Sequence, residues 1–347
     1  MALAEPLLLA GAPGSPYTRK MLALLRYRRL PYRVIWKHPR EMPDMPQPRP
    51  ALLPTFYLPD ADGALRAVVD STPLIARFDD AYPERRARPA NPVVRFLDDL
   101  LEDYADEWLT KAMFHYRWHY EADIARAGSI LPRWRVDPAP EERMVEMGKI
   151  FSERQISRLY VVGSNQTTAP IIEASYERFL DLFRAHLEVS SFLLGRRPAA
   201  ADFAVFGQLT ALTHFDPTPM ALTLQRAPRV YAWVDLVEDL SGLDPAEEDW
   251  ISPDAVPPTL TALLGEVGRV YVPFLLANAA AIASGAEQVD TEIDGARWVQ
   301  PPFPYQAKCL TVLREKHAAL TGPELTAVDA ILRGTGCERL FDQVAPA

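Results

Sequence analysis

The chain has 347 residues, of which 48% are hydrophobic and 24% charged, with 37 basic and 46 acidic side chains and a net charge of −9. No block of lysine and arginine interrupts this acidic balance, which excludes a surface built to follow a nucleic-acid backbone. The length predicts two or three domains, and the apolar content suffices for a core in each.

The N-terminal residues lack a basic leader, and no apolar stretch approaches the length of a membrane span. We therefore expect a cytoplasmic protein without a membrane partner. The two cysteines, Cys309 and Cys337, are too few for a disulfide framework and suit a reducing compartment.

The first 36 residues predict a strand, helix, strand unit. Residues 5–10, with an apolar run from Leu7 to Ala10, are typical of a buried strand, 16–29 are typical of a helix, and 32–36 hold aromatic and β-branched residues. Ser15 precedes a proline at the first helical position, where free backbone N–H groups and the positive dipole end favour an anion such as a thiolate. An ordinary helix cap has the same pattern, so this segment alone is weak evidence.

Two short strands and a helix are expected next. Seven prolines between Pro39 and Pro59 exclude a long helix there, and residues 55–58 and 65–69 flank an Asp-Ala-Asp-Gly turn typical of a hairpin. The cluster Asp70-Ser71-Thr72 then predicts the start of a helix that runs to about residue 81.

Long helical patterns replace short strands after Pro92. They cover roughly 92–127, 140–160, 168–194, 198–214 and 228–240, which predicts an all-helical second domain. An acidic, proline-bearing stretch at 244–258 follows, and the remainder is mostly helical at 259–285 and 303–342, with a short hairpin expected at Asp294-Gly295. We place the domains at 1–84, 92–243 and 244–347.

The order of these motifs resembles the glutathione transferase superfamily. The strand, helix, strand unit followed by Leu53-Pro54-Thr55, a hairpin and Asp70-Ser71 is similar to its thioredoxin-like N-terminal domain. The segment from Phe192 to Phe203 is similar to the signature of its all-helical C-terminal domain. The resemblance covers about residues 5–240 and implies a homodimer, whereas about 100 residues after Leu240 have no counterpart in a typical member.

The resemblance implies specific contacts with glutathione as co-substrate. Ser15 would donate to the glutathione sulfur and favour its thiolate, with Tyr17 as the alternative donor. Leu53, before a cis Pro54, would pair its backbone with the cysteinyl part. Asp70 and Ser71 would take the ammonium and carboxylate of the γ-glutamyl end. Lys37 or His38 is a candidate for the glycyl carboxylate, because the proline-rich 39–52 segment replaces the usual contact region.

The resemblance also implies that the first helix of the second domain lines a pocket for the second substrate. Four residues at intervals of three and four, which share one helix face, would line it or would instead pack between domains or subunits: Tyr104, Trp108, Lys111 and His115. His115, His119 and Asp123 form a stripe with metal-ligand spacing, but no general-base motif accompanies it, and we predict no metal.

The sequence thus predicts a serine-type glutathione transferase that attacks an apolar, small-molecule electrophile. Position 15 is a serine and position 18 a threonine, so thiol-disulfide chemistry by the protein itself is not expected. Two alternatives stay open: a non-catalytic binding or scaffold module acting through the C-terminal extension, and a glutathione-dependent lyase or etherase. Ala199 stands where the C-terminal signature usually has a Ser or Thr cap.

Overall fold

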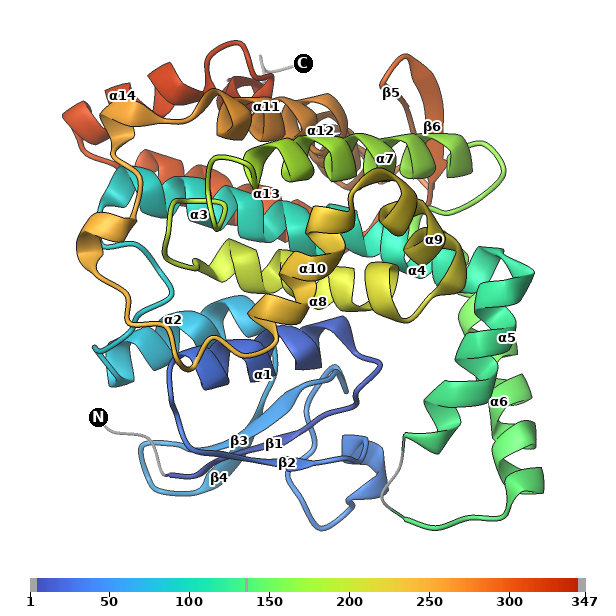
Figure 1. Ribbon diagram of the computed structural model, residues 1–347. Helices are drawn as coiled ribbons and strands as arrows, with labels where there is room; N and C mark the ends of the chain where they lie inside the picture. The colour runs from blue at the N-terminus through green and yellow to red at the C-terminus, as the bar shows by residue number, and fades with distance from the viewer. Residues whose placement is uncertain (1–4, 135–136, 343–347) are drawn as a thin grey trace.

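The computed structural model describes residues 5–134 and 137–342. Its N-terminal part is a mixed four-stranded sheet in the order β2-β1-β3-β4, with β1 and β2 parallel and the other neighbours antiparallel. Two helices cover the sheet on the side that faces the rest of the chain (Figure 1). This confirms the thioredoxin-like fold expected from the sequence. The elements are β1 (Leu7–Ala10), α1 (Pro16–Tyr27), β2 (Tyr32–Ile35), η1 (Pro39–Glu41), β3 (Thr55–Pro59), β4 (Leu65–Val68) and α2 (Ser71–Ala81).

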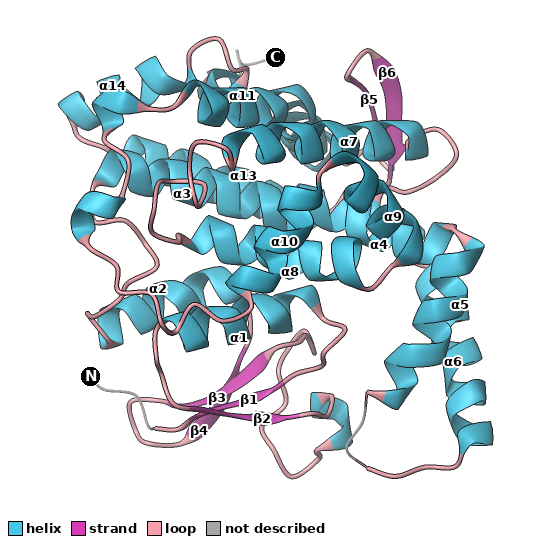
Figure 2. Cartoon of the chain, in the orientation of Figure 1, coloured by secondary structure: helices cyan, strands magenta, loops and turns pink. Residues whose placement is uncertain are grey.

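A helical part follows and stacks on α1 and α2 (Figure 2). Its first helix is continuous from Pro92 to His119 but contains a π-helical turn, η2, in the middle. The predicted 92–127 helix ends at His119 because Tyr120 is extended, and the helix over 217–226 is additional to the prediction. The elements are α3 (Pro92–Tyr104), η2 (Ala105–Leu109), α4 (Thr110–His119), α5 (Glu121–Ile130), η3 (Leu131–Arg133), α6 (Glu141–Ile156), η4 (Leu159–Val162), α7 (Ala169–His186), α8 (Ala200–His214), α9 (Pro217–Arg226) and α10 (Pro228–Val237).

Helices α5 and α6 form an arm that runs down beside the sheet (Figure 1). They cross at two glycines, where a Cβ placed on Gly148 would lie 2.2 Å from the carbonyl oxygen of Gly128. Because no side chain fits there, these glycines allow the close approach of the two helix backbones.

Helix α8 is the centre of the helical part and is capped without a serine or threonine at Ala199. The buried Asp202 carboxylate accepts hydrogen bonds from the backbone N–H groups of Ala199 and Leu193, at 2.8 and 2.9 Å. Asp202 in the first turn therefore satisfies the N–H of the N-cap residue itself, which is the acidic residue's half of a capping box.

The C-terminal extension, residues 244–342 as described, is mainly helical and packs on the helical part. Its longest helix is continuous from Pro258 to Ser284 through a second π-helical turn, and the predicted hairpin turn has positive φ at Asp294 and Gly295. The elements are η5 (Glu247–Asp249), η6 (Pro253–Ala255), α11 (Pro258–Glu266), η7 (Val267–Tyr271), α12 (Val272–Ser284), β5 (Val289–Ile293), β6 (Ala296–Gln300), α13 (Pro304–Ala318), α14 (Gly322–Leu332) and η8 (Cys337–Phe341).

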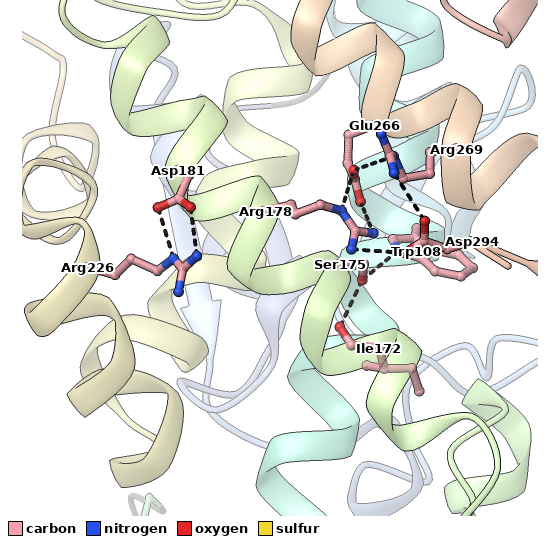
Figure 3. A network of polar contacts seen from close by, with 9 residues as sticks. All are labelled: Trp108, Ile172, Ser175, Arg178, Asp181, Arg226, Glu266, Arg269 and Asp294. Atoms are coloured by element: carbon pink, nitrogen blue, oxygen red, sulfur yellow. Dashed lines mark hydrogen bonds and ion pairs between the residues drawn. The ribbon is translucent and has the colours of Figure 1, made fainter. Parts of the chain in front are cut away.

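An ion-pair network fastens the extension to α7 (Figure 3). The Arg178 guanidinium binds Glu266 of α11 at 2.9 Å and Asp294 of the β5–β6 turn at 2.9 Å. Arg269 of η7 lies 3.2 Å from the same Asp294. The pairing of one arginine with both a buried and a partly buried carboxylate fixes the extension against the helical part.

The helix Pro258–Ser284 is the one described helix that is long and apolar enough to cross a membrane by length and composition, and 61% of its apolar window is buried inside the protein. This corrects the expectation that no stretch reaches such a length. The buried core helix of a soluble protein passes the same test.

Candidate functional site

The predicted glutathione-site segments meet at one edge of the sheet. The carboxyl ends of β1 and β2 lie side by side, because Ala10 pairs with Ile35, and Ala10 also pairs with Thr55 at the start of β3. Strands β3 and β4 are antiparallel and Phe56 pairs with Val68. Pro54 and Asp70, each two residues further along this register, therefore lie at the same edge. Four loops that are far apart in the sequence therefore converge at the edge where ligands commonly bind to α/β sheets.

Ser15 caps helix α1 and faces a cleft between the sheet and the helical part. Its Oγ accepts a hydrogen bond from the Thr18 N–H at 3.2 Å and donates to the Leu53 carbonyl oxygen at 3.4 Å. The second contact is long for an O–H···O bond, so the hydroxyl hydrogen is weakly held and available to a better acceptor.

Leu53 lines the same cleft, and the peptide bond between Leu53 and Pro54 is cis. Pro54 itself is buried, and the Thr55 hydroxyl donates to the Leu52 carbonyl oxygen at 2.6 Å. These contacts hold the loop so that the Leu53 backbone stands at the entrance of β3, beside Ser15.

Asp70 and Ser71 lie at the start of α2. Asp70 has φ 79°, a positive value that is uncommon for a residue with a side chain. The Ser71 hydroxyl accepts a hydrogen bond from the Lys20 ammonium at 2.9 Å. Lys20 is fully buried and also binds Glu102 and Asp106, at 2.7 and 2.6 Å, so this serine rests on a buried ion-pair network that joins α1 to the helical part.

Tyr17 does not line the cleft. Its hydroxyl donates to the Asp106 carbonyl oxygen at 2.7 Å, between the two domains. Burial raises the pKa of Tyr17 well above its usual value, and the nearby Glu107 and Asp106 carboxylates raise it further. The arrangement gives Tyr17 an interdomain contact.

The cleft has a volume of about 640 Å³. Its floor is the loop from Gly11 to Pro16 with Leu53, and its opposite walls come from α4, η3 and α6. These walls are mainly apolar, and their principal side chains are Met113, Phe114, Trp118, Leu131, Trp134, Met147 and Phe151.

Arg117 ties the cleft together across the domains. Its guanidinium forms an ion pair with the buried Asp216 at 3.0 Å, and its Nη1 donates to the Gly14 carbonyl oxygen at 3.1 Å. Arg117, which belongs to the helical part, thereby holds Gly14, the residue before Ser15, in place. Burial raises the pKa of Asp216 to about 6 despite the partner arginine.

The four residues predicted to line the second-substrate pocket share a helix face, but they lie away from this cleft. Trp108 packs on Trp298 of the extension with ring centroids 5.3 Å apart, and Tyr104 packs on Tyr271 at 6.0 Å. The Lys111 ammonium donates to the Gln300 side chain at 3.3 Å, and burial lowers the pKa of Lys111 to about 7. The extension and α7 cover this face. These residues therefore pack between parts of the chain, as the alternative interpretation of the sequence expected, and do not line the pocket.

His115 belongs to a polar cluster on the same face, which is the one group among the described residues with spacing for a metal ion. The ligand atoms of His115, His119 and Glu173 lie within 4.8 Å of one another. His115 is hydrogen-bonded to Ser164 at 2.8 Å and to Glu173 at 3.0 Å. Asp123, the third member of the predicted stripe, instead accepts a hydrogen bond from the Thr218 N–H at 3.0 Å.

Cations gather at the end of the cleft formed by η1 and α6, where the sequence predicted only Lys37 or His38. Lys37 lines the cleft and forms an ion pair with Asp137 of the arm at 2.8 Å. Burial lowers the pKa of His38, and the neighbouring Arg40 and Arg154 charges lower it further. Arg158 also lines this end, which makes it an anion-attracting surface.

Two family models match this chain, one in the N-terminal part and one in the helical part. Residues 9–86 match the family model described as glutathione S-transferase, N-terminal domain, and residues 153–236 match that described as glutathione S-transferase, C-terminal domain. Most of the arm and the whole extension lie outside both matches. None of the curated proteins searched matches the chain.

Solved structures of similar shape include a glutathione S-transferase from Rhodospirillum rubrum F11, with 19% identity over 67% of this chain and 87% of that one, and a TM-score of 0.41. A glutathione transferase from Burkholderia graminis, with two glutathione molecules bound per subunit, has 16% identity over 67% and 83% of the chains and a TM-score of 0.43. The beta-etherase LigF from Sphingobium has 15% identity over 70% and 97%, with a TM-score of 0.40.

Proposed function

The chain belongs to the glutathione S-transferase superfamily, and on that premise we propose that it is a serine-type enzyme that transfers glutathione to an apolar electrophile. The observation that carries the proposal is the convergence of Ser15, Leu53 and Asp70 at one edge of the sheet, beside an apolar cleft. Homodimer formation and a cytoplasmic location stay predictions from the sequence.

Ser15 is proposed to stabilise the thiolate of glutathione. Its hydroxyl is held at the N-terminus of α1 by the Thr18 N–H, and its own hydrogen points along a weak 3.4 Å contact with Leu53. A sulfur atom placed over the helix start would accept this hydrogen and experience the positive end of the helix dipole. Both effects favour the charged form and lower the thiol pKa.

The rest of the tripeptide fits the two ends of the sheet edge. The Leu53 backbone would pair with the cysteinyl part, and the start of α2 offers N–H groups for the γ-glutamyl carboxylate with Asp70 for its ammonium. At the other end, Arg40 and Arg154 supply positive charge for the glycyl carboxylate beside Lys37.

The electrophile is proposed to occupy the apolar part of the cleft, between Ser15 and the walls from α4 and α6. Phe114, Trp118 and Phe151 offer aromatic surface there, which suits a substrate with a ring system. Holding the thiolate and the electrophilic carbon together in a largely apolar space supplies most of the expected rate gain.

Binding of glutathione is the first test. Glutathione at a hundred times its dissociation constant stabilises a protein that binds it by about 2.7 kcal/mol, which a thermal melt detects. An unchanged melting temperature together with no retention on immobilised glutathione would exclude the proposal. Binding without turnover of aryl halides or of β-aryl ethers would favour the scaffold alternative.

Ser15→Ala then separates catalysis from binding. One lost charge-assisted hydrogen bond is worth about 1.5–3 kcal/mol, so we expect kcat at pH 7 to fall about 10- to 100-fold with little change in glutathione affinity. The fall should shrink at high pH, where the thiol ionises without help. Ser15→Thr, which keeps the hydroxyl, should retain most of the rate.

The control is Asn91→Ala, which removes the side-chain cap of α3 far from the cleft. It should lower stability by about 1 kcal/mol, as the loss of a cap does, and leave kcat unchanged. Equal rates for the Ser15→Ala variant and the unmodified protein would show that backbone N–H groups alone stabilise the thiolate.

A further inference from the structure

The C-terminal extension reaches the γ-glutamyl end of the proposed glutathione site. Tyr305, the second residue of α13, donates its hydroxyl hydrogen to Oδ2 of Asp70 at 3.1 Å. The Tyr305 side chain is 40% exposed, so it lies at the surface of the site rather than in the core. It is separated from Asp70 by 235 positions in the sequence.

The start of α13 is held firmly in this place. The Asn278 side chain of α12 donates to the Phe303 carbonyl oxygen at 2.9 Å and accepts from the Phe303 N–H at 2.8 Å. One residue after Tyr305, the nearly buried Gln306 donates to the Glu107 carboxylate at 3.0 Å. Further along the helix, Lys316 pairs with Asp99 at 2.7 Å. Tyr305 therefore meets Asp70 from a rigid helix that is fixed at both ends.

Asp70 needs such support because of its own backbone. A residue with φ 79° is held in a sparsely populated conformation by its surroundings, and its carboxylate stands free of its own helix because it makes no capping hydrogen bond there. The Tyr305 hydroxyl occupies one carboxylate oxygen, Oδ2, and this fixes the direction in which the second oxygen, Oδ1, points.

The surroundings of this carboxylate offer oxygen acceptors to a cation. Burial raises the pKa of the Tyr305 hydroxyl and the Asp70 charge raises it further, so the hydroxyl keeps its hydrogen and donates it to Asp70. Oδ1 of the buried Asp106 and Oε1 of Gln306 have no hydrogen-bond partner among the described residues. Lys20 supplies positive charge behind Ser71, but its ammonium is already bonded to two carboxylates.

We propose that Tyr305 is a positioning residue for glutathione: it orients Asp70 so that Oδ1 accepts from the γ-glutamyl ammonium group. This rests on the proposed function and gives the extension a task, since a segment outside both family matches completes the binding site within the same chain. A purely structural role, in which Tyr305 only anchors α13, is the alternative that the experiment must exclude.

The test compares two ligands on Tyr305→Phe, which removes only the hydroxyl. With glutathione we expect KM to rise about 3- to 10-fold at unchanged kcat, the range for one hydrogen bond to a charged group near the surface. With glutathione whose γ-glutamyl α-amino group is replaced by hydrogen, the variant and the unmodified protein should have equal KM values, because no ammonium is present to be oriented.

Controls separate positioning from folding. Tyr160→Phe removes the hydroxyl of a 55% exposed tyrosine in η4 and should change neither KM. In an Asp70→Asn background, Tyr305→Phe should add little further loss, because the two residues act through one contact. Circular dichroism and melting temperatures of all variants check that α13 stays in place.

The outcomes are distinct. Equal KM values for glutathione with and without the Tyr305 hydroxyl would overturn this inference and leave the proposed function standing. Equal losses with both ligands would likewise overturn it, in favour of a structural anchor. If the unmodified protein binds no glutathione, the proposed function and this inference fall together.

Discussion

The two ends of the proposed glutathione site have opposite charge. At the η1 and α6 end, Arg40, Arg154, Arg158 and Lys37 line the cleft and outnumber the carboxylates of Glu41 and of Asp137, and helix α6 of the arm supplies one of the four cations. At the α2 end, Asp70 is the carboxylate of the site, because burial raises the pKa of the neighbouring Glu107 to about 8 and Asp106 is paired with Lys20. The N-terminal domain lies between them and contributes to both.

The difference in charge between the two ends favours one orientation of the bound tripeptide. A tripeptide with an ammonium and a carboxylate at one end and a lone carboxylate at the other can lie along the sheet edge favourably in one orientation only. In the second orientation its ammonium would face the arginines. The four cations and Asp70 lie within the two family matches, whereas Asp106 and Glu107 lie between them.

The strongest way to break the acidic end is to remove its buried cation with Lys20→Met. Glu102 and Asp106 would then be buried without a partner, which costs about 3–5 kcal/mol, and the melting temperature should fall sharply at pH 7. Adding Glu102→Gln and Asp106→Asn should restore most of the loss. Lys149→Met, at an exposed position of α6, is the matched control and should melt within 0.5 kcal/mol or so of the unmodified protein.

The basic end is tested by Arg154→Gln. We expect KM for glutathione to rise about 3- to 10-fold, because a charge-assisted contact with the glycyl carboxylate is lost, and the effect should shrink at high salt. γ-Glutamylcysteine, which lacks the glycine, should respond less. Arg143→Gln changes an exposed arginine of the same helix that does not line the cleft, and a similar KM rise there would refute a local contact.

The smallest effect concerns pH and stability at the acidic end. Burial raises the pKa of Glu107 to about 8 from its ordinary 4.5, and Asp103 adds to the rise. The folded state therefore holds this proton more tightly than the unfolded state, and stability falls as pH rises from about 4.5 to about 8.

Glu107→Gln should remove that fall, so its melting temperature should exceed that of the unmodified protein at pH 8 and approach it near pH 4.5. Comparing the two curves isolates Glu107 from Asp103 and Asp106, whose pKa values burial raises to about 6 and about 7. Glu142→Gln, an exposed position on α6, serves as control. Parallel curves for Glu107→Gln and the unmodified protein would contradict this pH dependence.

Local motifs predicted the strands, the helix starts and the order of the sheet loops, because cap residues, turn residues and period-2 runs act over a few positions. The placement of Ser15 beside Leu53 follows from this order once the strands pair. Asp202, in the first turn of α8, accepts from the N–H of Ala199, which is again a contact between near neighbours in the sequence.

Long-range packing determines the features of the site that local sequence patterns did not predict. Helical spacing grouped Tyr104, Trp108 and Lys111 on one face, but which neighbour covers that face depends on Trp298 and Tyr271, which lie well over a hundred positions further along the chain. Arg154 of α6 lines the cleft in an arm whose two helices pack closely at Gly128 and Gly148. Neither relation leaves a periodic signal.

The contact between Tyr305 and Asp70 forms only late in the synthesis of the chain. A ribosome that adds 5–20 residues per second needs about 10–50 s to travel the 235 positions between them, while the N-terminal domain already has all of its strands. During this interval the nascent chain presents Ser15 and Leu53 without the tyrosine that steadies Asp70. Full competence for the tripeptide therefore arrives late in synthesis, and an interrupted translation product would carry the sheet edge without it.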